Sequence, residues 1–516
     1  MKQRQDTGVA GRWAQRGLFG FCLAVFLLTY NTRLGSIDAV ILFDTAAALY
    51  ERGTFAIENP RATRGVDGRY YSKYGPLQSL VAVPLYAAGK LAARVLPVPE
   101  RHLTRAAVAL LNPVVTAWLA ALLFGVGCRL GLSPRRAAAA ALLYAFATIA
   151  WYYSKTFFSE PLTALLIVAG FARALSYRAT GAARHLWVAG ACAALAVATR
   201  PVALLAVPVL ALGALGGSGR RPRAVAGLLV PLVVVGALLA LYNYLRFGSP
   251  LDTGYHGESF STPPWVGLAG LLVSPRCGLL FYAPILVLAP WGYRTLARRQ
   301  PHAARAIALL GVLWLLAMSA WSCWWAGGSW GPRLLLPLFP FLAILTAAAL
   351  PSPRSRRWPL LAGVVVLVAA SVAVQGASVL VTNARWEYGV DLLAQAEGGN
   401  SLWSFRYMPL RWQASYAREV LDPARPYRVT EATLLPGEEE DAPPRALDPL
   451  RARERSENRL DGHVVDAWYA LFALMGLPLV PLLAGVLLLL AVAGASLVVL
   501  ISAVDRMAGE QLTDGP

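Results

Sequence analysis

Long apolar runs separated by short arginine-rich turns are the feature that most constrains this chain. Examples are residues 226–241 and 477–501, and runs of about 18 or more apolar residues are long enough to cross a bilayer as helices. Hydrophobic residues make up 57% of the 516 residues and charged residues 15%, whereas soluble domains average roughly 45–50% and about 25%. The sequence therefore predicts an all-α polytopic membrane protein.

The arginine-rich turns predict how the chain is oriented. A net charge of +19 would suggest nucleic-acid binding in a soluble protein, but positive charge between apolar runs marks cytoplasmic loops instead. All of these turns lie on the cytoplasmic side only if residues 76–96 do not cross the membrane. We expect this segment to lie along the outer interface, because it is interrupted by Pro84, Gly89, Lys90 and Arg94. About twelve crossings follow, with both termini cytoplasmic. They are expected near 18–32, 105–127, 138–153, 161–176, 186–199, 202–216, 225–244, 278–293, 306–325, 334–350, 359–382 and 470–503.

This threading divides the chain into three parts. Residues 1–382 form a transmembrane module, whose first outer loop, 33–105, is expected to carry juxtamembrane helices. Residues 383–466 are polar and mixed in charge, which predicts a small outer-face domain. Residues 467–516 supply the last transmembrane helix and a cytoplasmic tail. No internal repeat is visible in the sequence, so the repeat architecture of many transporters gains no support.

The first outer loop begins with an acid. Asp38 follows the first span beside Ile37, Val40 and Ile41, and an acid among apolar side chains at a membrane surface loses hydration. That loss raises a carboxyl pKa toward the range useful for a general base. The alternative is that Asp38 only caps the helix that follows it. Asp44 lies six residues further on, nearly two turns along the same predicted helix.

Lysine is rare in this chain. Only four occur, and Lys73, Lys90 and Lys155 all fall on the outer face, where positive charge is least expected. A compact ammonium group suits a phosphate oxygen, although chance among so few residues is the alternative. Lys155 is followed by Glu160 and Pro161, a pair that is also typical of a helix start.

The later outer loops add cations and aromatic residues. Four tryptophans fall within ten residues at 321–330, which predicts either an interfacial belt or a platform for a sugar ring or prenyl chain. Arg200 and Arg276 are further outer-face cations, and the cysteines show no metal-ligand spacing. The remaining candidates to line a substrate cavity are Asp44, Tyr74, Lys155, Tyr255, His256, Glu258, Trp325 and Arg333.

Taken in order, these segments resemble the GT-C superfamily of membrane glycosyltransferases. The resemblance is closest to the branch of protein O-mannosyltransferases and lipid A aminoarabinose transferases, and it covers residues 15–350. Asp38 in Gly-Ser-Ile-Asp matches the family's catalytic aspartate, and Lys73 falls where relatives place a lysine near the carrier phosphate. Glu160 in Phe-Ser-Glu-Pro matches the second acidic motif. Thr199-Arg-Pro201, Phe247-Gly-Ser-Pro250 and Gly331-Pro-Arg333 also look like motifs of bacterial members.

The resemblance implies an activity and a site. A glycosyl unit would pass from a polyprenyl-phosphate sugar to an extracytoplasmic glycan, lipid or protein by inverting displacement. Asp38 would take the acceptor proton, Glu160 would orient sugar or acceptor, and Lys73, Arg200 and Arg276 would stabilise the leaving phosphate. No metal or other cofactor is expected. The protein would lie in a bacterial inner membrane with its active site on the outer face, among membrane lipids.

Two departures leave alternatives open. Ala39 follows Asp38 where relatives often have a second acid, and residues 383–466 match nothing in the family, which leaves the acceptor undefined. A twelve-span transporter or lipid flippase would place charged residues in mid-span along a path. A polymerase or ligase of lipid-linked oligosaccharides would act through arginine and histidine in large late loops, so substitution of Asp38 distinguishes it.

The predicted topology is testable by cysteine labelling. In a background without the five native cysteines, a cysteine at position 100 should react with a membrane-impermeant thiol reagent from outside. A cysteine at position 133 should react only after permeabilisation, because the adjacent arginines hold that turn in the cytoplasm. Labelling of position 100 from the cytoplasmic side alone would contradict both the threading and the interfacial placement of residues 76–96.

Overall fold

The computed structural model describes residues 2–214, 222–351, 358–381, 390–391, 394, 397–421, 466–474 and 477–513. Most of the predicted outer domain, 383–466, lies outside the described residues. The first elements are α1 (Lys2–Leu28), α2 (Ile37–Arg52), β1 (Ala56–Ile57), β2 (Thr63–Arg64), β3 (Tyr70–Tyr71), α3 (Leu77–Ala92), α4 (Glu100–Ala109), α5 (Leu111–Arg129), α6 (Pro134–Phe146), α7 (Ala150–Ser154) and α8 (Glu160–Thr180).

The later elements continue the helical pattern. They are α9 (Arg184–Thr199), η1 (Pro201–Ala206), α10 (Val207–Ala214), α11 (Pro222–Phe247), α12 (Pro264–Val273), α13 (Leu279–Tyr282), η2 (Pro284–Leu288), α14 (Ala289–Arg299), α15 (Pro301–Ala320), η3 (Arg333–Leu338), α16 (Phe339–Ala349), α17 (Trp358–Leu380), η4 (Phe405–Tyr407), α19 (Pro409–Leu421), α21 (Trp468–Leu474) and α22 (Leu479–Thr513).

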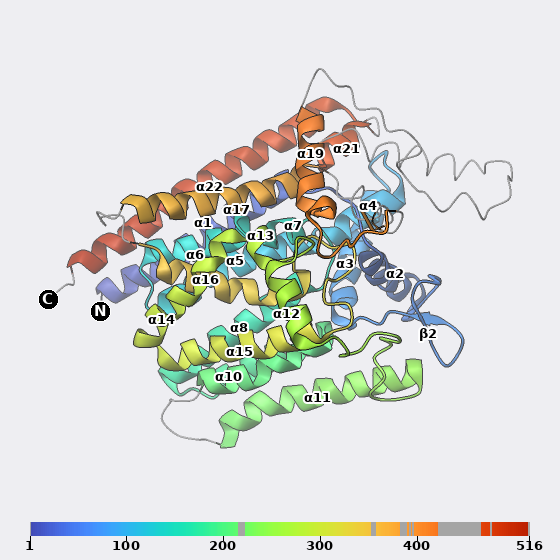
Figure 1. Cartoon of the computed structure of the whole chain (residues 1–516), viewed down its shortest axis with the longest axis horizontal. Helices are drawn as coiled ribbons and strands as arrows, with labels where there is room; N and C mark the ends of the chain where they lie inside the picture. Colours follow the sequence, from blue (N-terminus) through green and yellow to red (C-terminus); the bar gives the residue numbers. More distant parts are fainter. Residues whose placement is uncertain are drawn as a thin grey trace.

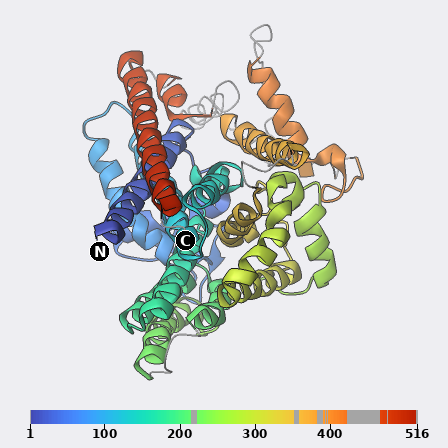
Figure 2. The same ribbon diagram turned by 90° about the vertical axis from the view of Figure 1, so that its left-hand side faces the viewer.

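The long helices run side by side along one direction (Figures 1 and 2). Both termini lie at one end of this bundle, while α2, α4 and the small sheet lie at the other end. At the end with the termini, Arg135 forms an ion pair with Asp505 at 3.0 Å, and Arg136 donates to the carbonyl of Leu350. Arginines at this end are what the positive-inside rule predicts for the cytoplasmic face.

The predicted helical, multi-pass membrane class is confirmed. Six helices among the described residues are long and apolar enough to cross a bilayer, namely 100–129, 160–180, 225–247, 301–320, 358–380 and 479–510. The other expected crossings coincide with α1 or with shorter and broken helices, several of which restart at a proline, as η1 does at Pro201. Proline lacks the amide hydrogen that would continue a helix. The count of twelve stays a prediction.

One helix falls where the sequence predicted only a loop. The apolar run that forms α12 is too short to cross a bilayer, so a threading based on length passes over it. Two glycines allow α12 to pack closely against its neighbours. A side chain at Gly267 would meet the backbone of Ser319, and one at Gly270 would meet the Trp324 ring.

Residues 33–105 form helices, as predicted, and the first of them, α2, shows which residue caps it. The Ser36 hydroxyl accepts a hydrogen bond from the amide of Ala39, and α2 ends at Gly53 with φ 63°, a left-handed conformation that glycine adopts without strain. Ser36 is therefore the N-cap, so the alternative that Asp38 serves only as a cap is wrong. Helix α3 packs between α2 and α4, and Gly89 leaves room for the α4 backbone at Thr104.

A buried ion pair joins Asp466, the last residue of the predicted outer domain, to the helical bundle. Lys155 Nζ lies 2.7 Å from Asp466 Oδ2, and the Asn31 side chain donates to the same oxygen at 2.9 Å. The amide of Asp466 donates to the carbonyl of Leu380 at 2.9 Å. The chain thus returns at Asp466 to the place where it left α17. Nearby, Gln413 of α19 donates to the carbonyls of residues 377 and 381 on α17 and beyond its end.

This pair yields a stability prediction. Lys155→Met leaves the Asp466 carboxylate buried without its cation, which typically costs about 3–5 kcal/mol, whereas adding Asp466→Leu should recover most of the loss. The measurement is the thermal unfolding midpoint in detergent. Arg406→Gln is the control, because its ion pair with Glu397 is exposed and should contribute little. A double variant as unstable as Lys155→Met alone would contradict the prediction.

Candidate active site

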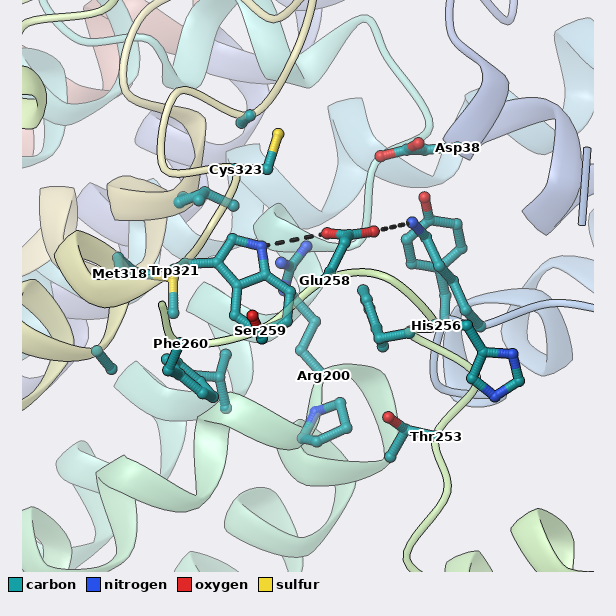
Figure 3. A pocket seen from close by; sticks show the side chains of 18 of the residues that line it. Asp38, Arg200, Thr253, His256, Glu258, Ser259, Phe260, Met318, Trp321 and Cys323 are labelled. Carbon is teal, nitrogen blue, oxygen red and sulfur yellow. Dashed lines mark hydrogen bonds and ion pairs between the residues drawn. The ribbon is translucent and has the colours of Figure 1, made fainter. Parts of the chain in front are cut away.

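A cavity of about 980 Å³ opens at the end of the bundle opposite the termini. Its walls come from the start of α2, the turn before α3, the α9–η1 junction, the 251–260 loop, the end of α15 and the start of η3. Figure 3 shows several of these side chains. The site candidates that line it are Asp38, Lys73, Tyr74, Arg200, Tyr255, His256, Glu258 and Arg333.

Asp38 is held by an arginine far away in the sequence. Arg333 Nη1 lies 2.8 Å from Asp38 Oδ2, and their side chains are 10% and 27% exposed. Burial acts to raise the pKa of Asp38, but the charge of Arg333 and hydrogen bonds from Tyr74 and Arg333 outweigh it and lower the pKa below its usual range. The sequence prediction of a raised pKa is therefore wrong, because it considered burial without the partner cation.

Glu160 lies behind the cavity wall and reaches the cavity through two arginines. Its side chain is 1% exposed, and Oε1 lies 2.6 Å from Arg200 Nη1 and 3.5 Å from Arg333 Nε. The Arg333 guanidinium also stacks 4.1 Å from the ring centre of Phe158. Negative and positive groups thus alternate from Arg200 through Glu160 and Arg333 to Asp38. A buried carboxylate in this position fixes the two guanidinium groups.

Lys73 lines the same cavity, near enough to Asp38 that its charge helps to lower the pKa of that carboxyl. Its ammonium group forms an ion pair with Glu258 and lies 5.0 Å from the ring centre of Tyr255 and 5.6 Å from that of Tyr74. The second Glu258 oxygen accepts a hydrogen bond from the Trp321 indole at 3.2 Å. Figure 3 shows Glu258 beside Trp321, with Asp38 above.

Close backbone packing brings Lys73 toward Arg200. Gly75 lies against the carbonyls of Ala198 and Thr199, where an added side chain would meet backbone atoms at 2.2 Å. Arg246, at the end of α11, donates to the carbonyl of Ser72. The turn that carries Lys73 is thus fixed from both sides, and only glycine at position 75 permits so close an approach.

Five of the predicted site residues do not line the cavity. Glu160 acts through the arginines as described, and Asp44 accepts a hydrogen bond from Asn59 at 3.0 Å. Lys155 forms an ion pair with Asp466, Arg276 lies 3.0 Å from Asp391, and Trp325 packs beside Trp324. Sequence reasoning placed all five on the outer face, but it had no means of knowing which partners they meet there.

The cavity also contains residues that the sequence did not single out. Trp321, Asp252, Phe260 and Met318 line it. Trp321 belongs to the tryptophan-rich stretch, which gave the right segment but not the right ring. Phe260 and Met318 carry no signal that separates them from other apolar residues of a membrane protein. Within the described part of the chain, no group of three or more His, Cys, Asp or Glu side chains has the geometry to hold a metal ion.

Comparison with known proteins gives matches among solved structures alone. No protein-family profile and no curated protein matches the chain. ArnT from Cupriavidus metallidurans in the apo state matches with 17% identity and a TM-score of 0.46, over 95% of this chain and 75% of ArnT. ArnT bound to undecaprenyl phosphate matches with 15% identity and a TM-score of 0.45, over 95% and 76%.

A third match is the archaeal oligosaccharyltransferase AglB from Archaeoglobus fulgidus, in complex with an inhibitory peptide and a dolichol-phosphate. It shares 12% identity at a TM-score of 0.45, over 81% of this chain and 59% of AglB. These matches are GT-C glycosyltransferases, the superfamily that the sequence resembles. At such identities and TM-scores, the roles of individual residues rest on the geometry of this chain.

The Asp38–Arg333 pair predicts how Asp38 titrates. Arg333→Gln removes the cation that lowers the Asp38 pKa and leaves the burial that raises it, so the pKa should rise. A hydrophobic carbodiimide modifies protonated carboxyl groups, and mass spectrometry of the peptide containing Asp38 reads its reaction at each pH. Modification should begin at a higher pH in Arg333→Gln than in the unsubstituted protein, with Arg333→Lys in between. Identical pH profiles would show that Arg333 does not control Asp38.

Proposed function

We propose that this protein is a glycosyltransferase that moves a sugar from a polyprenyl-phosphate donor to an acceptor on the outer face of a bacterial inner membrane. The observation that carries the proposal is the presence of the Asp38 carboxylate and the Lys73 and Arg200 cations around one cavity. A carboxylate serves as a general base, and the cations stabilise a leaving phosphate. The acceptor class, whether glycan, lipid or protein, is open.

The proposed reaction is a single inverting displacement. The acceptor hydroxyl oxygen attacks the anomeric carbon, and the hydroxyl proton passes to Asp38. The lowered pKa of Asp38 means that this carboxyl is ionised at neutral pH and can accept the proton. The bond between the anomeric carbon and the phosphate oxygen breaks, and the phosphate leaves with the bonding electron pair. Lys73 and Arg200 stabilise the negative charge on that phosphate. The buried Glu160 holds the arginines in place, so its role is positional.

The charge distribution favours this proposal over a transporter. A transport path needs polar groups along the depth of the bundle. The described charges that line the cavity instead lie together at one end of the bundle. A polymerase or ligase of lipid-linked oligosaccharides stays an alternative of the same broad class. Dependence on Asp38 separates it from the proposed mechanism.

The enzyme proposal predicts the effect of removing the base. Asp38→Asn keeps the shape of the side chain but accepts no proton, and loss of a general base typically lowers rate by about 10²–10⁴. We expect transfer from an undecaprenyl phosphosugar in liposomes to fall by at least about 100-fold, with donor binding retained.

Asp44→Asn is the matched control on the same helix. Asp44 does not line the cavity and bonds to Asn59, so its substitution should change the transfer rate little. Near-normal transfer by Asp38→Asn would remove the proposed mechanism. A strong defect confined to Asp44→Asn would mean that the other carboxylate is the base.

A further inference from the structure

Trp321 is held in a fixed orientation on one wall of the cavity. Its indole nitrogen donates to Glu258 Oε2 at 3.2 Å. Its ring meets Tyr255 and Phe260 edge-on, with centroids 5.8 and 4.9 Å away. The backbone around it is fixed too, because the amide of Ser322 donates to the carbonyl of Ser259 at 2.7 Å. An indole with its N–H already satisfied presents an apolar ring rather than a hydrogen-bond donor.

The same wall also carries a carboxylate. Glu258 is paired with Lys73 on one oxygen and with Trp321 on the other, and its side chain is 27% exposed. Figure 3 shows it beside the indole at the centre of the cavity. A carboxylate oxygen has lone pairs enough to accept further hydrogen bonds, and its ion pair with Lys73 keeps it from repelling a nearby phosphate.

An aromatic ring next to a carboxylate suits a particular kind of ligand. A sugar ring has an apolar C–H face that packs on an indole and hydroxyl groups at its edge that donate to a carboxylate. A prenyl chain would desolvate the carboxylate without replacing its hydrogen bonds, which is costly. Elsewhere the cavity offers a wall without charge, formed by Val202, Leu204 and Leu205 of η1, which suits hydrocarbon better.

We infer that Trp321 and Glu258 form the subsite for the sugar ring of the donor. The inference rests on the proposed function, since it assigns one part of that donor. Because Glu258 contacts Lys73, a sugar in this subsite lies beside the cation proposed to bind the phosphate. The anomeric carbon, which joins sugar to phosphate, is then at the boundary between the two subsites, on the side of the cavity that Asp38 faces.

The test separates the sugar from the rest of the donor. Dissociation constants are measured for the full chain in nanodiscs with undecaprenyl phosphate and with undecaprenyl phosphate carrying glucose, mannose or arabinose. In the unsubstituted protein at least one phosphosugar should bind more tightly than undecaprenyl phosphate. Trp321→Leu should weaken binding of that phosphosugar by roughly tenfold, while undecaprenyl phosphate binds within about twofold of normal.

Two further variants sharpen the result. Glu258→Gln should also reduce the advantage of the phosphosugar over undecaprenyl phosphate, because a neutral amide accepts hydroxyl hydrogen bonds less strongly. Trp325→Leu is the matched control, since that ring lies in the same stretch but does not line the cavity, and it should leave both affinities unchanged. Retained binding of undecaprenyl phosphate shows that each variant is folded.

Equal weakening of both ligands by Trp321→Leu would overturn the subsite, because the wall would then hold the phosphate or the prenyl chain. The subsite would also be overturned if the unsubstituted protein bound undecaprenyl phosphate as tightly as it bound each of the three phosphosugars. Absence of binding to every one of these lipids would overturn the proposed function itself, so the two failures are distinguishable.

Discussion

The Arg333 guanidinium is the group around which the charged side of the site is organised. It meets Asp38 at 2.8 Å and Glu160 at 3.5 Å, and it stacks on Phe158. These partners come from α2 and from the turn that begins α8, so one side chain joins three distant segments. A guanidinium is suited to this task because it is planar and always charged, so it can donate to Asp38 while its charge attracts Glu160.

Every cation that lines the cavity already has a carboxylate partner. Lys73 is paired with Glu258, Arg200 with Glu160 and Arg333 with Asp38, while His256 faces Asp252. The described cavity is therefore close to neutral, and in the proposed reaction the phosphate would share these cations with the carboxylates that hold them. A site of this kind binds its anion through preorganised donors rather than through a large excess of positive charge.

Sequence reasoning reached the membrane class, the presence of helices in residues 33–105 and most of the polar residues that line the cavity. It did so because hydropathy and arginine placement are local properties of the sequence. It failed where a property depends on a partner. The pKa of Asp38 depends on Arg333, and Lys155 and Arg276 turn out to meet Asp466 and Asp391. The sequence analysis did not predict the short helix α12, because its apolar run is too short to be recognised as a membrane span.

The adjacency of Leu380 and Asp466, which are joined by a hydrogen bond, has a consequence for how such a chain diversifies. A segment whose two ends meet can be lengthened, shortened or exchanged without displacing the helices on either side. The entropic cost of a longer loop grows slowly, by about 0.6 kcal/mol for each doubling. The length of the segment between these two residues can therefore change while the helices that line the cavity keep their places.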